Sequence, residues 1–236
     1  MHFKRKERKM KNTTPVCEKQ RTPLKKNIFY RAAKRVMDIV CSAIGLVLLS
    51  PLFIVIMILI VAEDGSPAIY KQKRIGKGGR EFSIYKFRSM YKDADKIHEK
   101  MKADMGVTEV SFKLSDSEDP RITRIGRFIR KTNIDELPQL WNILCGQMSI
   151  VGPRPLAVYE YEDEQKMYEG RFDERYDVPQ GLTCYWQAQF SKRGDIDFDD
   201  RMQMDVDYAR DANLWIDIKL IFSTAIHIIA GKAGYS

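Results

Sequence analysis

The sequence is poor in the residues that most often bind metals or cross-link a chain. It has only four cysteines, which are far apart and form no CxxC pair, and three histidines that form no metal or catalytic cluster. This pattern argues against a zinc site and a disulfide framework and favours a reducing, cytosolic setting. The residues concerned are Cys17, Cys41, Cys145, Cys184, His2, His98 and His227.

Glycine-rich nucleotide loops and repeats are also missing. The stretch "GKGGR" at 76–80 has three glycines, but the GxGxxG spacing of a dinucleotide-binding loop is absent. No internal repeat or low-complexity tract is found. The 236 residues fit one sizeable domain, or one domain with a membrane element.

Acidic residues are scarce at one end of the chain. Residues 1–35 hold thirteen Lys or Arg against two acids, whereas the whole chain has a formal net charge of +8. A basic protein often binds nucleic acid. Here, however, the basic charge belongs to a tail beside an apolar segment, and residues 156–211 are acidic, which favours an anionic membrane surface and no nucleic-acid partner. We predict that residues 1–29 form a basic, disordered tail.

One long segment carries no charge at all. It runs for 24 residues from Ile39 to Ala62, which is long enough to cross a bilayer. The run is too long for a signal peptide, and no small-residue cleavage site follows closely. A single transmembrane helix is the default by length, but basic residues flank both ends, and positive charge marks the cytoplasmic side. The basic residues after the segment are Lys71, Lys73, Arg74, Lys77, Arg80, Lys86 and Arg88.

Ser50 and Pro51 interrupt this segment at its midpoint. Pro51 donates no hydrogen bond and clashes with the carbonyl of Val47, which kinks a helix, while the Ser50 hydroxyl is suited to bond a freed carbonyl. Each arm of 11 residues reaches roughly 16 Å, about half of a ~30 Å hydrocarbon core. We therefore predict that residues 30–63 form a re-entrant membrane helix that enters, breaks at Ser50-Pro51 and returns.

Residues 64–236 are predicted to form a cytosolic catalytic domain, so that the whole chain is α+β and mostly helical. Ala68–Arg74 and Glu81–Arg88 are typical of a short β-hairpin around the glycine turn. Residues 91–118 favour a polar helix followed by a loop. Residues 214–230 are apolar with scattered polar positions, which fits either a core helix or an amphipathic helix in the membrane interface.

A basic stretch, "DPRITRIGRFIRK", occupies 119–131. Asp119 is predicted as the N-cap of a helix and Pro120 as its first helical residue. Isoleucines at helical spacing form an apolar stripe, and arginines fill much of the remaining surface. That surface is either a solvated face or a binding surface for the phosphates of lipid headgroups or of a substrate.

The next stretch, "TNIDELPQLWNILCGQMSIVGPRP", places two acids beside these arginines. Four apolar residues recur at helical spacing and predict a helix packed on the core, with Pro138 tolerated in its first turn. They are Leu137, Leu140, Trp141 and Leu144. Asp135 and Glu136 then lie at a helix N-terminus, where acids commonly act as caps. The alternative is a Mg²⁺ site, because Mg²⁺ binds one or two carboxylates together with substrate phosphates.

A proline-flanked arginine and an aromatic loop follow. The turn from Val151 to Pro155 is rigid and presents Arg154, whose planar guanidinium suits bidentate phosphate binding. Further on, "PQGLTCYWQAQF" is rich in aromatic residues for a loop. Its Trp186 is suited to stack on a base, although its spacing favours a place in the core.

From about residue 30 to residue 232, the chain resembles the bacterial sugar transferases of the monotopic phosphoglycosyl transferase family. The matching blocks are "KRVMDIV", the Ser50-Pro51 break, "IYKFRSM", the central block from "DPRITRIG" to "SIVGPRP", and "LWIDIKLIFSTA". The central block is highly specific, because many unrelated features occur in it in order. Many members read "PGxTGWAQ" where this chain has "PQGLTCYWQ", a departure at Cys184, Tyr185 and Trp186 that concerns nucleotide or sugar contacts.

The resemblance implies a phosphoglycosyl transferase that moves a sugar-1-phosphate from a UDP-sugar to polyprenyl (undecaprenyl) phosphate. It would release UMP and initiate the synthesis of exopolysaccharide, capsule or another surface glycan. Asp135 would be the nucleophile that forms an aspartyl phosphosugar, Glu136 would support it, and both would hold Mg²⁺. The substrate phosphates would be bound by Arg130, Arg154, Lys86 and Arg88.

The same resemblance implies a place at the bacterial cytoplasmic membrane, with the re-entrant helix in inner-membrane lipid and the catalytic domain on the cytoplasmic face. Which sugar is transferred, which glycan is built and whether the chain forms a homodimer are left open. The alternative function is a single-span membrane protein whose basic region binds nucleic acid or anionic lipid without chemistry. That alternative accounts for the basic tail, but not for an acidic pair set among arginines.

Overall fold

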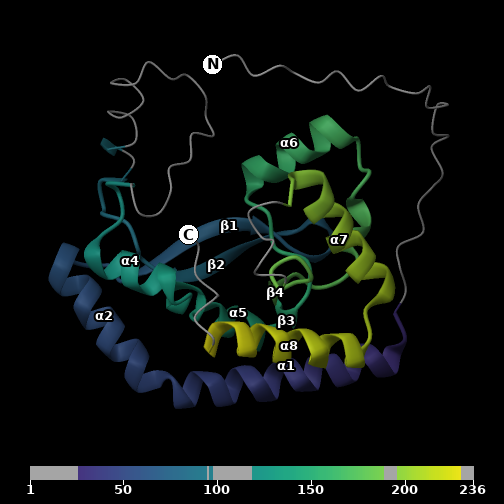
Figure 1. The fold of residues 1–236 in the computed structure, drawn as a ribbon, viewed down its shortest axis with the longest axis horizontal. Coiled ribbons are helices and arrows are strands. Elements are labelled where there is room, and N and C mark those ends of the chain that lie inside the picture. Colours follow the sequence, from purple (N-terminus) through teal and green to yellow (C-terminus); the bar gives the residue numbers. More distant parts are fainter. Residues whose placement is uncertain (1–25, 95, 98–118, 189–195, 230–236) are drawn as a thin grey trace.

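The computed structural model describes residues 26–94, 96–97, 119–188 and 196–229. Within them the protein is mostly helical, with one β-hairpin and a second, two-stranded sheet (Figure 1), which confirms the predicted balance of helix and strand. The predicted basic tail up to residue 25, and most of the helix and loop expected over 91–118, lie outside the described residues.

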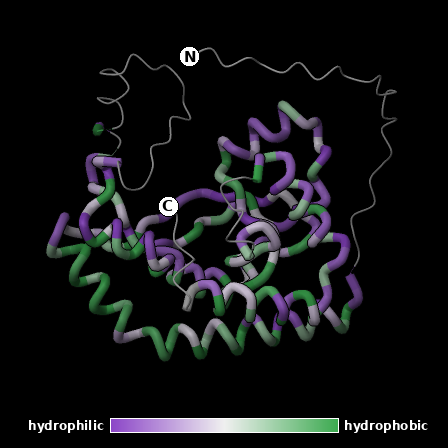
Figure 2. The backbone as a smooth tube through the Cα atoms, viewed as in Figure 1, coloured by the Kyte–Doolittle hydropathy of each residue, from purple (hydrophilic) through white to green (hydrophobic). Residues whose placement is uncertain are grey.

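Two apolar helices meet at the serine–proline pair and form a bent arm along one side of the molecule (Figures 1 and 2). α1 spans Ile28–Leu48 and α2 spans Ser50–Asp64, with a bend of 60° between them. The Ser50 hydroxyl donates to the Val47 carbonyl at 2.8 Å, which satisfies the group that Pro51 leaves without a donor. The predicted helix break is confirmed, and it takes the form of an open bend.

Taken singly, none of the described helices is long and apolar enough to cross a membrane, whereas the bent α1–α2 pair meets that test in length and composition. The outer face of α2 is bare: Ile58 is 62% exposed and Ile54 is 54% exposed. Its inner face packs on the domain through Ile56 and Ile60, which contact a cluster that includes Ile129. The domain therefore covers only one side of α2.

A β-hairpin follows α2. β1 spans Ile69–Ile75 and β2 spans Glu81–Phe87, and the two strands pair antiparallel. The turn between them holds the short 3-10 helix η1 (Lys77–Gly79), in which Gly78 and Gly79 adopt the positive φ that glycine tolerates best. Both predicted strands are confirmed to within one residue at each end.

The basic helix α4 spans Arg124–Lys131 and begins later than predicted. Its N-cap is Thr123, whose hydroxyl accepts a hydrogen bond from a first-turn amide at 2.8 Å. The carboxylate of Asp119 does not cap the helix because it is engaged by Arg121 at 2.6 Å, and the intervening chain stays extended in a β-bridge. The prediction that the helix starts at Asp119 and Pro120 was therefore wrong.

The remaining elements surround a short parallel sheet. After the 3-10 helix η2 (Ile134–Glu136) come α5 (Gln139–Leu144) and β3 (Ser149–Val151), which pairs with β4 (Gly181–Thr183). The others are α6 (Val158–Tyr168), η3 (Asp173–Tyr176), α7 (Phe198–Asp211) and α8 (Leu214–Ile229). Figure 1 shows α8 beside α1, and α6 and α7 on the side of the domain away from that helix.

α5 buries a different face from the one predicted. Asn142 and Ile143 are fully buried, whereas Trp141, which the spacing placed in the core, is 53% exposed. The reason is that α5 binds β2 through a side-chain amide: Asn142 accepts from the Tyr85 amide at 3.0 Å and donates to the Ser83 carbonyl at 2.7 Å. A polar residue thus takes the central position of the helix and turns Trp141 outward.

Replacement of Asn142 by Leu, which has the same branching and number of side-chain heavy atoms, is expected to destabilise the fold by about 2–3 kcal/mol. The Tyr85 amide and the Ser83 carbonyl then lose their partner, and an unsatisfied buried polar group is costly. Chemical denaturation in detergent measures the change. The control Gln147→Leu removes only an exposed partner of Asn142 and should cost less than about 0.5 kcal/mol. Equal losses in the two variants would contradict the prediction.

α1 is joined to the domain by hydrogen bonds as well as by packing. Arg35 donates to the carbonyls of Ile143 at 2.6 Å and Leu144 at 2.8 Å, at the C-terminal end of α5, where a cation also meets the helix dipole favourably. Asp38 accepts from the Ile150 amide at 2.9 Å and so binds β3. One apolar helix therefore holds both α5 and β3.

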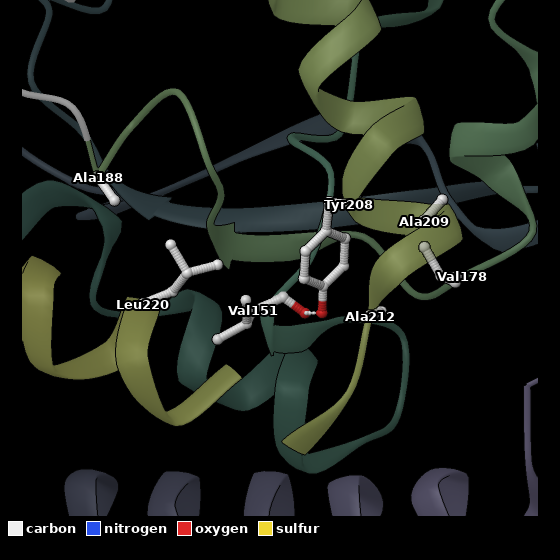
Figure 3. Close-up of a cluster of buried hydrophobic side chains, with 7 residues drawn as sticks. All are labelled: Val151, Val178, Ala188, Tyr208, Ala209, Ala212 and Leu220. Atoms are coloured by element: carbon white, nitrogen blue, oxygen red, sulfur yellow. Dashed lines mark hydrogen bonds between the residues drawn. The ribbon is translucent and has the colours of Figure 1, made fainter. Parts of the chain in front are cut away.

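A buried polar network joins α1 to α7 and α8. Lys34 forms an ion pair with Asp217 at 2.9 Å and donates to the Tyr208 hydroxyl at 3.2 Å. That hydroxyl lies 2.6 Å from Asp217 and 3.2 Å from the Val151 carbonyl, inside the apolar cluster drawn in Figure 3. α8 packs on the core along one face, where Asp217 is buried, and is exposed on the other, where Trp215 is 74% exposed; the alternative of a helix in the membrane interface stays a prediction.

Candidate active site

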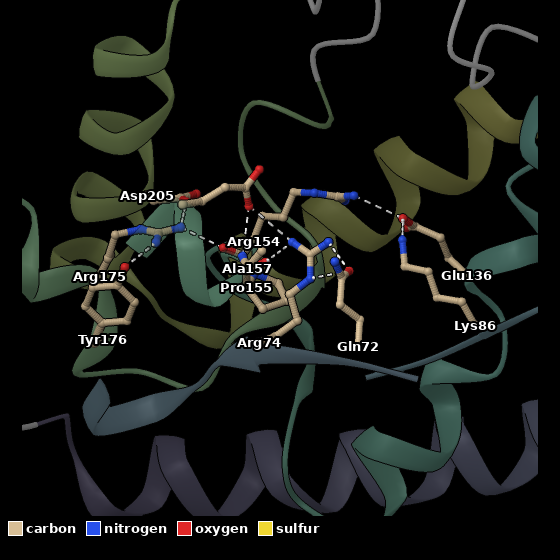
Figure 4. Close-up of polar contacts among 11 residues, drawn as sticks. Gln72, Arg74, Lys86, Glu136, Arg154, Pro155, Ala157, Arg175, Tyr176 and Asp205 are labelled. Atoms are coloured by element: carbon tan, nitrogen blue, oxygen red, sulfur yellow. Dashed lines mark hydrogen bonds and ion pairs between the residues drawn. The ribbon is translucent and has the colours of Figure 1, made fainter. Parts of the chain in front are cut away.

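The acidic pair lies on η2, a single helical turn between α4 and α5. Asn133 adopts a left-handed conformation, with φ at 54°, which turns the chain at the end of α4. Asp135 and Glu136 follow directly and precede α5, at the helix start where the sequence placed them. β2 and the turn after β3 supply the side chains that contact Glu136 (Figure 4).

Two cations hold Glu136. Lys86, from β2, donates to Glu136 Oε1 at 2.8 Å, and Arg154, from the turn after β3, donates to the same oxygen at 3.1 Å (Figure 4). Burial raises the pKa of the Glu136 carboxyl, but the charges and hydrogen bonds of Lys86 and Arg154 outweigh burial and hold that pKa well below its ordinary value. Glu136 is therefore an anion throughout the physiological range, with its charge already balanced.

Asp135 is in the opposite electrostatic situation. Burial, followed by the adjacent charge of Glu136, raises the pKa of Asp135 to about 6, against the opposing charges of Lys86, Arg130 and Arg154. The positive charges of these three residues act on Asp135 together. A desolvated carboxylate that is mostly ionised at neutral pH is suited to act as a nucleophile or as a general base.

The turn that presents Arg154 is closely packed. An added Cβ at Gly152 would lie only 2.2 Å from the Pro179 carbonyl, so only glycine allows this approach between the segments of β3 and β4. The Arg154 guanidinium lies 6.0 Å from the ring centre of Trp186, within the range of a cation–π contact. Trp186 is buried, which confirms its predicted place in the core.

A small pocket beside Glu136 contains two polar residues that sequence reasoning missed, Arg74 and Gln139. The pocket is lined by Arg74, Ile84, Lys86, Glu136, Gln139, Arg154, Pro155 and Gly181. Asp135 is adjacent in the chain but is not part of this lining. Strand alternation would have found Arg74: Lys86 pairs with Tyr70, and Arg74 is an even number of residues from Tyr70, so both face the same way. No comparable signal pointed to Gln139.

Arg88 lies elsewhere than the other three predicted phosphate ligands. Its guanidinium donates to the Gly65 carbonyl at 2.5 Å and lies 3.3 Å from the Asp64 carboxylate, at the C-terminal end of α2. A cation is favoured there by the helix dipole. These contacts indicate that Arg88 attaches α2 to the β-hairpin, and its expected contact with nucleotide phosphate stays a prediction.

The donor set of the acidic pair fits Mg²⁺. Among the described residues, no group of three or more His, Cys, Asp or Glu side chains could hold a metal ion. Mg²⁺ needs fewer protein ligands, because it keeps waters and takes substrate phosphates. Lys86 and Arg154 both bind Glu136 through Oε1, which leaves Oε2 for a metal, and Asp135 offers a second carboxylate.

Comparison with known protein families identifies the class to which the chain belongs. The chain belongs to the bacterial sugar transferase family, whose sequence profile matches residues 29–231. The match includes the bent helix pair, the acidic pair, the Arg154 turn and α8.

Three curated relatives show how far the similarity extends. The undecaprenyl-phosphate galactose phosphotransferase of Salmonella typhimurium is 42% identical over 209 residues, 87% of this chain and 42% of that protein. The UDP-glucose:undecaprenyl-phosphate glucose-1-phosphate transferase of Escherichia coli is 36% identical over 228 residues, 95% of this chain and 46% of that protein. The exopolysaccharide production protein ExoY of Rhizobium meliloti is 35% identical over 207 residues, 86% of this chain and 88% of that protein. The chain therefore spans less than half the length of the first two relatives and most of the third.

Proposed function

We propose that this protein transfers a sugar-1-phosphate from a UDP-sugar to undecaprenyl phosphate and so initiates a surface glycan such as exopolysaccharide or capsule. The observation that carries the proposal is the division of charge in the acidic pair. Glu136 is balanced by Lys86 and Arg154, whereas Asp135 is desolvated, with a pKa raised to about 6. The name of the Escherichia coli relative contains both a UDP-sugar donor and this acceptor, and the name of the Salmonella typhimurium relative contains the acceptor.

In the first step, a carboxylate oxygen of Asp135 attacks the β-phosphorus of the UDP-sugar. The new bond joins Asp135 to the phosphorus that carries the sugar, the bond from that phosphorus to the bridging oxygen breaks, and UMP leaves. Both partners are anionic, so their repulsion has to be offset. Lys86, Arg130 and Arg154 supply positive charge around Asp135.

In the second step, an oxygen of undecaprenyl phosphate attacks the phosphorus of the aspartyl phosphosugar. The bond to Asp135 breaks, the carboxylate is restored, and the product is undecaprenyl-diphospho-sugar. Division into two displacements lets one carboxylate serve both substrates in turn. Mg²⁺ bound at Asp135 and Glu136 would neutralise phosphate charge.

We further propose that the bent α1–α2 pair enters the cytoplasmic leaflet of the membrane and returns, with the catalytic domain on the cytoplasmic face. Both helices leave apolar side chains uncovered, and Figure 2 shows the arm as mostly hydrophobic around the bend, with hydrophilic stretches toward its two ends. α8 lies beside α1 and also exposes apolar residues, with Phe222 and Ile226 each 63% exposed. In water such a surface is unfavourable, whereas in lipid it is not.

The proposed topology predicts that the segment before α1 and the end of α8 lie on the same side of the membrane. A cysteine introduced near Lys26 and one introduced after Ile229 should therefore react alike with a membrane-impermeant thiol reagent in intact cells and in inverted vesicles. Both cysteines are introduced into a Cys17→Ser, Cys41→Ser, Cys145→Ser background, which keeps only the buried Cys184; that background without an introduced cysteine is the control. Labelling of the two sites from opposite sides would show that α1–α2 spans the membrane.

The proposed activity is tested by incubating the purified protein with Mg²⁺, undecaprenyl phosphate and a panel of UDP-sugars. UDP-galactose and UDP-glucose are the first donors to test, because the names of the relatives contain galactose and glucose. Release of UMP together with a lipid-linked diphosphosugar is the expected result. Absence of UMP with every donor tested would remove the proposed activity.

Arg154→Lys is expected to lower kcat/KM for the UDP-sugar by about 10- to 100-fold. Lysine keeps the positive charge but cannot reproduce the planar fork that contacts both Glu136 and a phosphate. Steady-state UMP release measures the effect. The matched control is Arg80→Lys in the exposed hairpin turn, which should leave the rate unchanged. Wild-type activity of Arg154→Lys would remove this arginine from the site.

A further inference from the structure

A second buried ion pair lies behind the Arg154 turn. Arg175, from η3, and Asp205, from α7, have no exposed side-chain surface, and their charged atoms are 2.6 Å apart. Neither residue stood out in the sequence. Figure 4 shows the pair on the side of the Arg154 turn that faces away from Glu136.

Stability alone does not account for this pair. Two buried charges lose their hydration, and a well-packed apolar pair of similar volume is often as stable or more stable. The pair is also incompletely satisfied, since Arg175 Nε and Asp205 Oδ1 find no hydrogen-bond partner in the part of the chain that the structure describes. Burial raises the pKa of the Asp205 carboxyl, against Arg175 and the backbone N–H of Arg154, which favour its ionised form. The cost of keeping these charges indicates a role beyond packing.

The contacts of the pair point to Arg154. Arg175 Nη2 donates both to Asp205 at 2.6 Å and to the backbone carbonyl of Arg154 at 2.6 Å. On the other flank of the turn, Arg74 donates to the Pro155 carbonyl at 3.1 Å. The peptide groups around Arg154 are thus held from two sides, while the Arg154 side chain reaches Glu136.

We propose that Arg175 and Asp205 are positioning residues that hold the backbone of Arg154 so that its guanidinium stays at Glu136 and the substrate phosphates. This inference rests on the proposed transferase function for its catalytic consequence. Neither residue reaches the acidic pair, so both act through Arg154.

The main test is an apolar exchange of the pair, Arg175→Met with Asp205→Leu. We expect the melting temperature to change little, whereas kcat/KM for UMP release falls by about 100-fold. The matched control is Arg210→Met, which breaks the exposed ion pair between Arg210 and Glu174, also joining α7 to η3, and should leave activity unchanged. Near-wild-type activity of the apolar exchange would overturn the proposal.

A coupling measurement separates positioning from a general structural role. If the pair acts through Arg154, the apolar exchange should lower activity by less than about 3-fold in an Arg154→Ala background, because residues that act as a unit are not additive. If the apolar exchange lowers activity in the Arg154→Ala background by as much as it does in the wild type, the proposal is overturned. Should the apolar exchange fail to fold, the near-isosteric Asp205→Asn is taken through the same cycle, with the same two outcomes.

A readout without catalysis keeps the inference distinct from the proposed function. Amide hydrogen exchange over residues 152–158 should be at least about 10-fold faster in the apolar exchange than in the wild type, and unchanged in Arg210→Met. Unchanged protection of this turn would overturn the positioning role even in an active enzyme. Suppose instead that exchange of this turn is faster in the variant, but that the wild-type protein itself releases no UMP. That result would support the positioning role and remove the proposed function.

Discussion

Asp135→Asn is expected to abolish UMP release, with a loss of at least about 10⁴-fold in kcat. The amide is neutral and a poor nucleophile, so no bond to phosphorus forms, while the size of the side chain is kept. In wild-type protein incubated with UDP-sugar and Mg²⁺ but without acceptor, intact-mass spectrometry should show the added mass of one phosphosugar. Peptide mapping should place this mass on the peptide that contains Asp135.

The control for this experiment is Asp200→Asn, an exposed acid in the first turn of α7, which should behave as the wild type. Thermal unfolding of all three proteins shows whether the fold is retained. Full turnover by Asp135→Asn, or a phosphosugar attached to another peptide, would contradict the nucleophile assignment. If Asp135→Asn loses UMP release but the wild type shows no phosphosugar adduct, direct transfer between the substrates would be favoured instead.

Glu136→Gln is expected to have the second largest effect, with kcat reduced about 10²- to 10³-fold. Lys86 and Arg154 share one oxygen of Glu136, at 2.8 Å and 3.1 Å. Without the negative charge, both cations lose the partner that fixes their position, and a carboxylate ligand for Mg²⁺ is lost. The variant should still form a small amount of adduct, because Asp135 is intact. A rate within 3-fold of the wild type would show that Glu136 is a simple helix cap.

Glu136→Gln should also change the pH dependence of the rate. The direction of that change follows from the causes that raise the pKa of Asp135. The attack needs ionised Asp135, so the wild-type rate should fall as the pH drops below about 6, the value to which burial and Glu136 raise the pKa of Asp135. In Glu136→Gln one raising influence is gone, while Lys86, Arg130 and Arg154 still lower this pKa. The acid limb of kcat/KM should therefore move to lower pH. A limb that stays in place or moves upward would contradict this account.

Local signals in the sequence were enough to predict several parts of the fold and site. The serine–proline break, the glycine turn of the hairpin and the acidic pair before α5 each depend on a few adjacent residues with strong conformational preferences. The prediction failed where a distant segment intervened. Thr123, not Asp119, caps α4 because Ile122 forms a β-bridge with the distant Met90 and because Arg121 occupies the Asp119 carboxylate. Trp141 is exposed because Asn142 takes the place facing β2.

The supporting residues around the site were beyond local reasoning for the same reason. Arg175 and Asp205 are 30 residues apart in the sequence, and nothing in the spacing of either one indicates a partner. Their significance depends on a backbone carbonyl of the Arg154 turn, which has no side-chain signature. Arg74 differs, because the alternation of the hairpin places it on the same face as Lys86. A paired-strand analysis therefore recovers one missed residue, and only a three-dimensional structure recovers the others.

The bonds from α1 to α5 and β3 have a consequence for the choice of acceptor. Because Arg35 and Asp38 attach α1 directly to the backbone of these two elements, no flexible linker would separate the membrane from Asp135. In the proposed topology, the height of Asp135 above the bilayer is then a constant of the fold. An acceptor has to present its phosphate at that height, so the enzyme selects by headgroup depth as well as by chemistry. Bilayer thickness then becomes a determinant of turnover, although the bulk lipids of the bilayer take no part in the reaction.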